Sequence, residues 1–293
     1  MLILKQKEEM KKSKGKWRII RRIIIVSAAI MITAGIITAC VIGGSYYFHK
    51  KQVEDVVSQV DERIDTIEEY SKKLQNNTQP QNKNSSESKE DSKPTKNEKG
   101  SYFEWNGTSD ANILPYKIDT EKLKEDSIKY NESLKKTQST KLVGEESYTY
   151  AALDLSKYGI YDNVYGYVSA PSIGMKLPIY LGVTDSNMAY GAAHFCYTSL
   201  PTGGESTNCV LAGHTGYVGR WLFDDIKNLS FGDDVEVKSY IGTLRYKVKK
   251  IKYVLPNESN DIYIEKGKDK LTLVTCTYSS DGTYMRCIVI CER

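Results

Sequence analysis

The chain begins with a basic segment followed by a long uncharged stretch. Residues 23–48 run 26 positions without a charged side chain. The hydrocarbon core of a bilayer takes about 20 residues of helix at about 1.5 Å each, so this stretch can span it with some tilt. A cleaved signal peptide is the alternative, but its apolar core has only about 7–15 residues. The pattern predicts a transmembrane helix over 23–48 behind a basic tail over 1–22.

Residues 49–75 carry one apolar stripe. The stripe positions alternate spacings of four and three, which places them on one helix face, and they are Val53, Val57, Val60, Ile64, Ile67, Ser71 and Leu74. This predicts an amphipathic juxtamembrane helix that lies near the membrane or on the rest of the protein, with a dimerising coiled coil as the alternative. Residues 76–100 have no large apolar side chain, which predicts a disordered linker.

The remaining chain divides into two parts. Residues 101–146 are predicted to be an N-terminal helical extension, with a peripheral helix capped at Asp119 or Thr120. From residue 147 the chain consists of short β-rich runs separated by Gly, Pro, Asn and Asp, with a helix expected within 219–229 from its apolar spacing. Seven or more short strands with one or two short helices predict a mainly β barrel or sandwich over 147–293.

The charge distribution sets the topology and excludes one class of partner. Residues 1–22 hold nine Lys or Arg and two Glu, a net of +7, whereas residues 101–293 hold 22 basic and 24 acidic residues, a net of −2. The globular part therefore gives no reason to expect nucleic-acid binding. Because basic residues precede the span, the positive-inside rule predicts a single-pass protein of the cell membrane. Its N-terminus would be cytoplasmic and everything after residue 48 extracellular.

The candidate chemistry begins at Cys276, which ends an apolar strand. Thr272, Val274 and Cys276 share one strand face, and because the leucines between them suit the core, this face is expected to line a groove. A buried structural thiol is the simpler interpretation. A three-residue loop over 280–282 with Gly282 in the left-handed conformation would pair Cys276 with Arg286 on the same face. A two-residue loop would turn the arginine away.

Histidine is scarce enough to limit the partners of this thiol. A cysteine nucleophile needs a base or imidazolium nearby to gain thiolate character. The sequence has three histidines: His49 at the membrane edge, His194 in a β-like run and His214 at the end of an apolar strand. His194 suits a packed position, and His214 suits a barrel rim. If Cys276 attacks a carbonyl, Arg286 could stabilise the oxyanion; a surface arginine is the alternative.

These residues lie in segments that resemble the sortases, the membrane-anchored cysteine transpeptidases of Gram-positive bacteria. The similar segments are "YGYVSAPSIGMKLPIYLG" (165–182), "AYGAAHF" with "SLPTGGESTNCVLAGHTG" (189–216), and "TLVTC" followed ten residues later by Arg286. The resemblance covers about 163–293. It implies a closed eight-stranded sortase-type β-barrel, with one or two short helices, after the transmembrane and stalk helices.

The resemblance also implies roles for individual residues. His214 would be the general acid/base, Cys276 the nucleophile that carries an acyl thioester, and Arg286 the group that positions the substrate and its oxyanion. Thr272 and Val274 would contact the substrate. His194 matches a family histidine that is not catalytic.

The implied reaction is cleavage of an LPxTG-like sorting signal after its threonine, followed by acyl transfer to an amine. The partners would be secreted surface proteins or pilins, with a cell-wall peptide or a pilin lysine as acceptor. The core is most similar to the pilin-assembling class C enzymes, whereas a single N-terminal anchor matches the layout of class A, D or E, so the subclass stays open. A membrane-tethered cysteine peptidase that only hydrolyses, and an inactive surface binding module, are the alternatives.

The sequence indicates little about cofactors and disulfides. The sequence has no metal-ligand spacing, phosphate loop or dinucleotide fingerprint, which predicts no cofactor and no metal. Ca²⁺, which some relatives bind, is an alternative that no motif indicates. Cys287 and Cys291 lie four apart on one strand, about 13 Å, beyond the ~7 Å limit for a disulfide. Cys196 with Cys209 remains an open pair.

Overall fold

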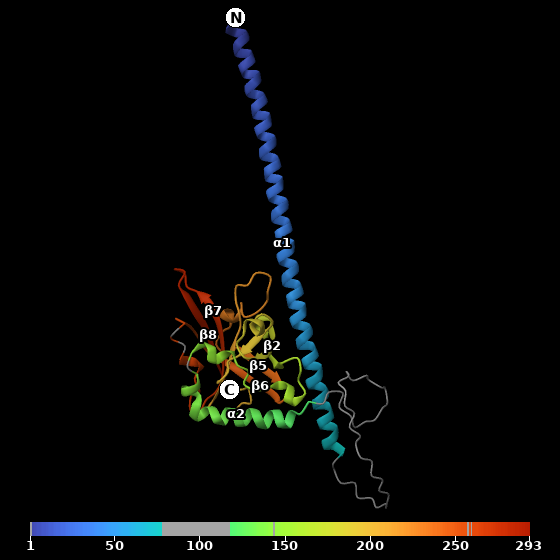
Figure 1. Cartoon of the computed structure of the whole chain (residues 1–293), viewed down its shortest axis with the longest axis vertical. Helices are drawn as coiled ribbons and strands as arrows, with labels where there is room; N and C mark the ends of the chain where they lie inside the picture. The colour runs from blue at the N-terminus through green and yellow to red at the C-terminus, as the bar shows by residue number, and fades with distance from the viewer. Residues whose placement is uncertain (1, 78–117, 143, 257, 259) are drawn as a thin grey trace, which may run out of the picture.

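The protein folds as a closed β-barrel beside one very long helix (Figure 1). The computed structural model describes residues 2–77, 118–142, 144–256, 258 and 260–293. The strands close in the order β1-β2-β3-β4-β7-β8-β6-β5, which confirms the predicted eight-stranded, mainly β fold. They are β1 (Val164–Ala170), β2 (Met175–Leu181), β3 (Ala192–His194), β4 (Thr207–Ala212), β5 (Asp234–Ser239), β6 (Gly242–Val254), β7 (Asp269–Tyr278) and β8 (Tyr284–Glu292).

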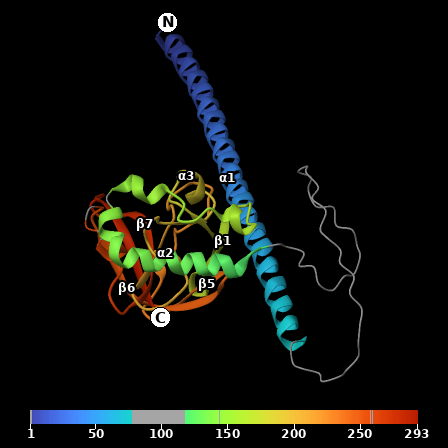
Figure 2. The same ribbon diagram turned by 60° about the horizontal axis from the view of Figure 1, so that its bottom comes forward.

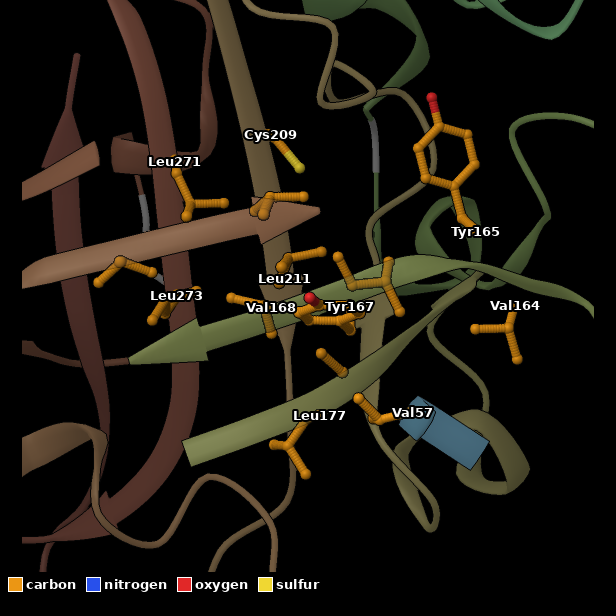
Figure 3. Close-up of a cluster of buried hydrophobic side chains, with 14 of the residues drawn as sticks. Val57, Val164, Tyr165, Tyr167, Val168, Leu177, Cys209, Leu211, Leu271 and Leu273 are labelled. Carbon is orange, nitrogen blue, oxygen red and sulfur yellow. The ribbon is translucent and has the colours of Figure 1, made fainter. Parts of the chain in front are cut away.

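The barrel interior is built by alternation along the strands. On β6, Tyr246 and Val248 are buried while the lysines between and after them are exposed, the burial pattern expected for a half-buried strand. Figure 3 shows Leu211 of β4, Leu273 of β7 and neighbouring side chains of β1 and β2 in the apolar cluster. This shared core fixes which face of β4 and β7 points inward.

The described residues form few helices. They are α1 (Leu2–Asn77), α2 (Thr120–Lys141) and α3 (Asp185–Met188), with 3₁₀ turns η1 (Glu145–Thr149), η2 (Leu155–Tyr158), η3 (Pro171–Ile173), η4 (Ile226–Asn228) and η5 (Asn260–Ile262). The predicted span and juxtamembrane helix form one unbroken helix, α1, which is long and apolar enough to cross a membrane. The predicted linker lies outside the described residues from position 78 onward, as do residues 101–117 of the extension.

The apolar stripe of α1 packs on the barrel. Val53, Val57, Val60 and Ile64 are almost fully buried and belong to the same cluster as the barrel core; Figure 3 places Val57 beside the strands. Since these side chains are already covered within one chain, the coiled-coil alternative for this stripe is wrong. The helix instead contacts β1 and β2.

One carboxylate ties the docked helix to three strands. Asp61 accepts hydrogen bonds from Lys238 Nζ of β5 at 2.6 Å, Lys176 Nζ of β2 at 3.0 Å and the Tyr167 hydroxyl of β1 at 2.9 Å. Burial alone would raise the pKa of Asp61, but these donors outweigh burial and hold that pKa at about 2. The ionised carboxylate is therefore part of the α1 contact.

The structure confirms the predicted start of α2 but not the helix predicted within 219–229. α2 begins as predicted, because the Asp119 carboxylate accepts from Lys122 N, and it lies along the barrel in Figure 2. The helix predicted within 219–229 is wrong, since only η4 forms there. Its apolar side chains are buried, but Phe223 N donates to His214 O at 3.0 Å, and the Asp224 carboxylate accepts from Gly216 N at 2.7 Å. These contacts hold a compact loop in place of a helix.

We expect Asp61→Asn to loosen α1 from the barrel. A carboxylate whose pKa is lowered from 3.8 to about 2 contributes about 2 kcal/mol of stability above pH 4, which is lost as the pH falls through 2. At pH 7 the variant should show roughly tenfold or faster hydrogen exchange in residues 53–67. Glu62→Gln, an exposed neighbour with the same change of charge, is the control. Equal exchange in both variants would contradict this role for Asp61.

Candidate active site

Three strands bring the predicted site residues to one end of the barrel. β4 and β7 pair in parallel with Ala212 beside Val274, so His214 and Cys276, each two residues further on, are level with one another. On the other side of β7, Cys276 pairs with Arg286 of β8. Neighbouring strands lie about 4.8 Å apart. Cys276 and Arg286 are therefore a cross-strand pair of β7 and β8, and His214 follows β4 by two residues on the other side of β7.

The chain beyond β4 stays attached to β7. Gly213 N donates to Val274 O at 3.2 Å, and the Thr275 hydroxyl donates to Gly213 O at 2.7 Å. A Cβ at Gly213 would lie 2.4 Å from the Phe223 ring, so only glycine fits before His214. This packing holds the histidine beside the cysteine strand.

The β7–β8 hairpin has the predicted register. Ser279 N donates to Thr283 O at 2.9 Å, which closes a three-residue loop, and Gly282 has a φ of 85°, a left-handed conformation that glycine adopts without strain. Cys276 and Arg286 consequently share one face. The two-residue alternative is excluded.

Two donors converge on the half-buried sulfur of Cys276. Arg286 Nη1 lies 2.7 Å from Sγ, and the Tyr284 hydroxyl donates to Sγ at 2.9 Å. Arg286 Nη1 also donates to the Tyr284 oxygen at 3.0 Å. Since a guanidinium can only donate, this arrangement suits an ionised sulfur or another anion at the same place.

Tyr284 is a site residue that the sequence analysis missed. The signal was present: Tyr284 lies two positions before Arg286, so strand parity puts both on the face that carries Cys276. Its ring also packs against Tyr278, the residue opposite it, with ring centroids 5.5 Å apart.

His214 is half-buried beside charged neighbours of both signs. Burial lowers its pKa below the usual value, the positive charge of Arg220 lowers it further, and the negative charge of Asp185 opposes them. The ring packs on Tyr217 with centroids 4.5 Å apart. These surroundings favour the neutral imidazole, the form that can accept a proton.

The other two histidines have structural contacts. His194 is fully buried with Nε2 3.0 Å from Ser199 O, and burial lowers its pKa to about 4, in agreement with its predicted packed position. His49 is also buried: Nε2 lies 2.8 Å from Ala189 O, and Nδ1 accepts from Trp221 N at 3.2 Å. His49 therefore joins α1 to the barrel.

Thr272 and Val274 share the Cys276 face as predicted, but they do not line an open groove. Thr272 has 0% exposure and donates its hydroxyl to Asn208 at 2.9 Å. Val274, 6% exposed, packs in a second apolar cluster with Leu142 and Ile262. Because the end of α2 and η5 cover this part of β7, only the end of the strand at Cys276 reaches the surface. Thr272 therefore has no exposed surface in this structure, and its contact with a substrate stays a prediction.

The cysteines are all free thiols, including Cys196 and Cys209. In the part of the chain that the structure describes, no three His, Cys, Asp or Glu side chains are arranged to hold a metal ion. The expectation of a cofactor-free protein stays a prediction.

We expect Arg220→Gln and Asp185→Asn to move the pKa of His214 in opposite directions. Removing the positive charge should raise this pKa and removing the negative charge should lower it, each by roughly half a pH unit. An NMR titration of the imidazole protons of the full chain in detergent measures both. His194, which is fully buried, serves as the internal reference. Shifts of the same sign would contradict the electrostatic account.

We expect Tyr284→Phe to slow alkylation of Cys276. A donated hydrogen bond favours the ionised sulfur, so its loss should reduce the rate with iodoacetamide at neutral pH by roughly three- to tenfold. Peptide mass spectrometry separates this thiol from the others. Tyr278→Phe, on the opposite strand, is the matched control. An unchanged rate in Tyr284→Phe would show that the hydroxyl does not act on the sulfur.

Comparison with known proteins places this geometry in a family. The model of the sortase domain matches residues 168–293. Sortase A of Bacillus anthracis is 31% identical over 120 residues, which cover 41% of this chain and 55% of that protein. The chain spans about half the length of the curated relatives it matches.

Solved structures agree in both fold and sequence. Sortase C1 of Streptococcus agalactiae, in complex with MTSET, is 29% identical with a TM-score of 0.51, covering 59% of this chain and 89% of that one. Sortase C2 of Group B Streptococcus pilus island 1 is 32% identical with a TM-score of 0.50, covering 59% of this chain and 96% of that one. Since that identity extends over nearly the whole of a solved sortase, the chain belongs to the sortase family.

Proposed function

We propose that this protein is a membrane-anchored cysteine transpeptidase that cleaves an LPxTG-like signal after its threonine and transfers the acyl group to an amine. The observation that supports it most is the convergence of Arg286 and Tyr284 on Cys276 Sγ, at 2.7 and 2.9 Å, with His214 level across the β4–β7 pair. A nucleophile, a proton carrier and oxyanion donors are the parts that acyl transfer needs.

The first step forms the acyl enzyme. As Cys276 Sγ attacks the carbonyl carbon of the threonine, the thiol proton passes to His214. The carbonyl oxygen takes up negative charge, which the Arg286 guanidinium stabilises by donated hydrogen bonds. The carbon–nitrogen bond then breaks as His214 donates a proton to the leaving nitrogen. The product is a thioester on Cys276 and a free amine.

The second step reverses these roles with a different amine. The neutral amine attacks the thioester carbon, His214 accepts the proton that the nitrogen loses, and the sulfur departs as thiolate next to Arg286 and Tyr284. Because burial favours neutral His214, the imidazole is ready for this proton transfer at neutral pH. Water in place of the amine would give hydrolysis.

The substrate class is proposed from the family. Surface proteins or pilins that carry an LPxTG-like signal would supply the acyl group, and a cell-wall peptide or a pilin lysine would supply the amine. The similarity to a sortase of a pilus island favours neither acceptor. The binding-module alternative expects an inaccessible, unreactive thiol, whereas Cys276 is half-buried at the end of a strand with two donors on its sulfur.

The cellular location follows from α1. Most side chains of its uncharged segment are exposed, and the helix is apolar enough to span a bilayer. With the basic residues of 1–22 in the cytoplasm, the barrel lies on the extracellular side. A secreted substrate and a cell-wall acceptor are both available there.

We expect the full chain in detergent to convert LPxTG-like peptides into a new amide when triglycine is added. Cys276→Ala should abolish the product, and Arg286→Lys should reduce its rate by roughly 10²–10³-fold, since one oriented oxyanion donor is lost. Mass spectrometry follows the thioester and both products. Arg245→Lys, an exposed arginine of β6 paired with Glu236, is the matched control and should keep full activity.

Other outcomes would change the proposal in specific ways. Hydrolysis at a rate that triglycine leaves unchanged would establish a peptidase. A Cys276 that forms no thioester with any peptide and resists iodoacetamide in the folded protein would establish a binding module.

A further inference from the structure

We propose that the loop after His214 rests in the headgroup layer of the membrane, so that the catalytic end of the barrel faces the bilayer. This loop, residues 215–221, is called the His214 loop below. The inference rests on the proposed anchoring by α1 and adds a second membrane contact, made by the barrel itself. The occupant of this surface is the outer face of the lipid bilayer.

The first argument is the level at which the loop meets α1. Ser45 Oγ donates to Gly219 O at 3.4 Å, and a Cβ built on Gly219 would lie 2.7 Å from Ser45 Oγ and 3.7 Å from Ile42 O. Gly219, with a φ of 76°, therefore lies against the Ser45 side chain of α1 with no room for a side chain of its own. Ile42 and Ser45 both belong to the uncharged segment 23–48, so the loop lies beside the last turns of the span.

The second argument is that the barrel is fixed to the helix at this level. Immediately after the span, His49 joins Trp221 N to Ala189 O, and Lys50 Nζ lies 5.2 Å from the centre of the Trp221 ring. The helix continues without interruption into the buried stripe that begins at Val53. The barrel therefore cannot move away from the membrane without breaking these contacts.

The third argument is the length of the uncharged segment. A hydrocarbon core takes about 20 residues of helix, about 30 Å, whereas segment 23–48 has 26 residues. The extra residues belong to the interfacial layers at its ends. The contacts at Ile42 and Ser45 consequently lie at the border between the acyl chains and the headgroups.

The fourth argument is the composition of the exposed surface at this border. In the His214 loop, Val218 is 75% exposed and Tyr217 is 51% exposed. On α1, Tyr47 and Phe48, which follow Ser45 by two and three residues, are also largely exposed. Aromatic side chains concentrate at the interfaces of membranes, where one edge is apolar and the other is wet. The exposed parts of these side chains would contact only water if the barrel stood free of the membrane.

The catalytic consequence follows from the strand directions. β4 and β7 both end at the His214 and Cys276 side of the barrel, and Figure 1 shows the β7–β8 hairpin pointing toward the same side as the N-terminal half of α1. Tyr217 connects the His214 loop to the active site, since its ring packs on His214. A peptide reaching Cys276 would therefore approach within the headgroup layer.

The test is depth-dependent quenching of a fluorescent probe in the full chain. The background carries Cys40→Ala and Cys276→Ala, which leaves only buried thiols. An environment-sensitive dye is attached to Val218→Cys, to Glu205→Cys, or to Cys40 retained in the Cys276→Ala protein. Glu205 is exposed just before β4, at the opposite end of the barrel. The vesicles contain phosphatidylcholine with a minor share of phosphatidylglycerol and lipids spin-labelled on the headgroup or on the acyl chain.

The expected result is a graded pattern. The dye at Cys40 should be quenched by lipids labelled on the acyl chain. The dye at Val218→Cys should show blue-shifted emission and lose most of its intensity to lipids labelled on the headgroup. The dye at Glu205→Cys should be quenched by neither lipid. If Cys40 is quenched while Val218→Cys behaves like Glu205→Cys, the loop proposal is overturned and anchoring stands. If Cys40 also escapes quenching, anchoring and loop placement both fail. The peptide assay, performed in detergent, tests transpeptidation separately.

Discussion

The parallel pairing of β4 with β7 is the contact on which the active site depends. His214 and Cys276 are 62 residues apart, and only the pairing of Ala212 with Val274 makes them level. A shift of one residue would turn one of the two side chains to the opposite face. The register is held by the buried side chains of both strands and by Gly213, whose backbone bonds to β7 and whose missing side chain makes room for Phe223.

The candidate catalytic residues differ from similar residues nearby in how far they are buried. His194 and His214 are both histidines of adjacent strand regions, but His194 is sealed inside the barrel with a pKa of about 4, whereas His214 is only half-buried. Thr272 and Cys276 share one strand face, but the end of α2 and η5 cover only the former. Access at the end of the barrel therefore separates the residues that can meet a peptide from those that hold the fold.

Because the long helix α1 is docked on the barrel, the fold itself sets where the active site lies relative to the membrane. Apolar packing of its stripe, the bonds to Asp61 and the contacts of His49 join α1 to β1, β2, β5 and the His214 loop. A flexible tether would leave the barrel free to turn. A docked helix gives the catalytic end one orientation, and the residues that set it lie far from the sulfur.

Local patterns in the sequence determined the strands of the barrel, the uncharged span, the Asp119 cap of α2 and, through Gly282, the pairing of Cys276 with Arg286. Each depends on neighbours within a few residues, where periodicity and backbone conformation are decisive. The tertiary structure alone decided the docking of the stripe, the burial of Thr272, the donor role of Tyr284 and the loop where 219–229 suggested a helix. These features depend on partners distant in the chain. The strands of the barrel cover Val57, the end of α2 and η5 cover Thr272, the sulfur of Cys276 meets the Tyr284 hydroxyl, and the Ser45 side chain of α1 bonds to Gly219. Apolar spacing shows that a side chain will be buried, but the surface that buries it exists only after the barrel has closed.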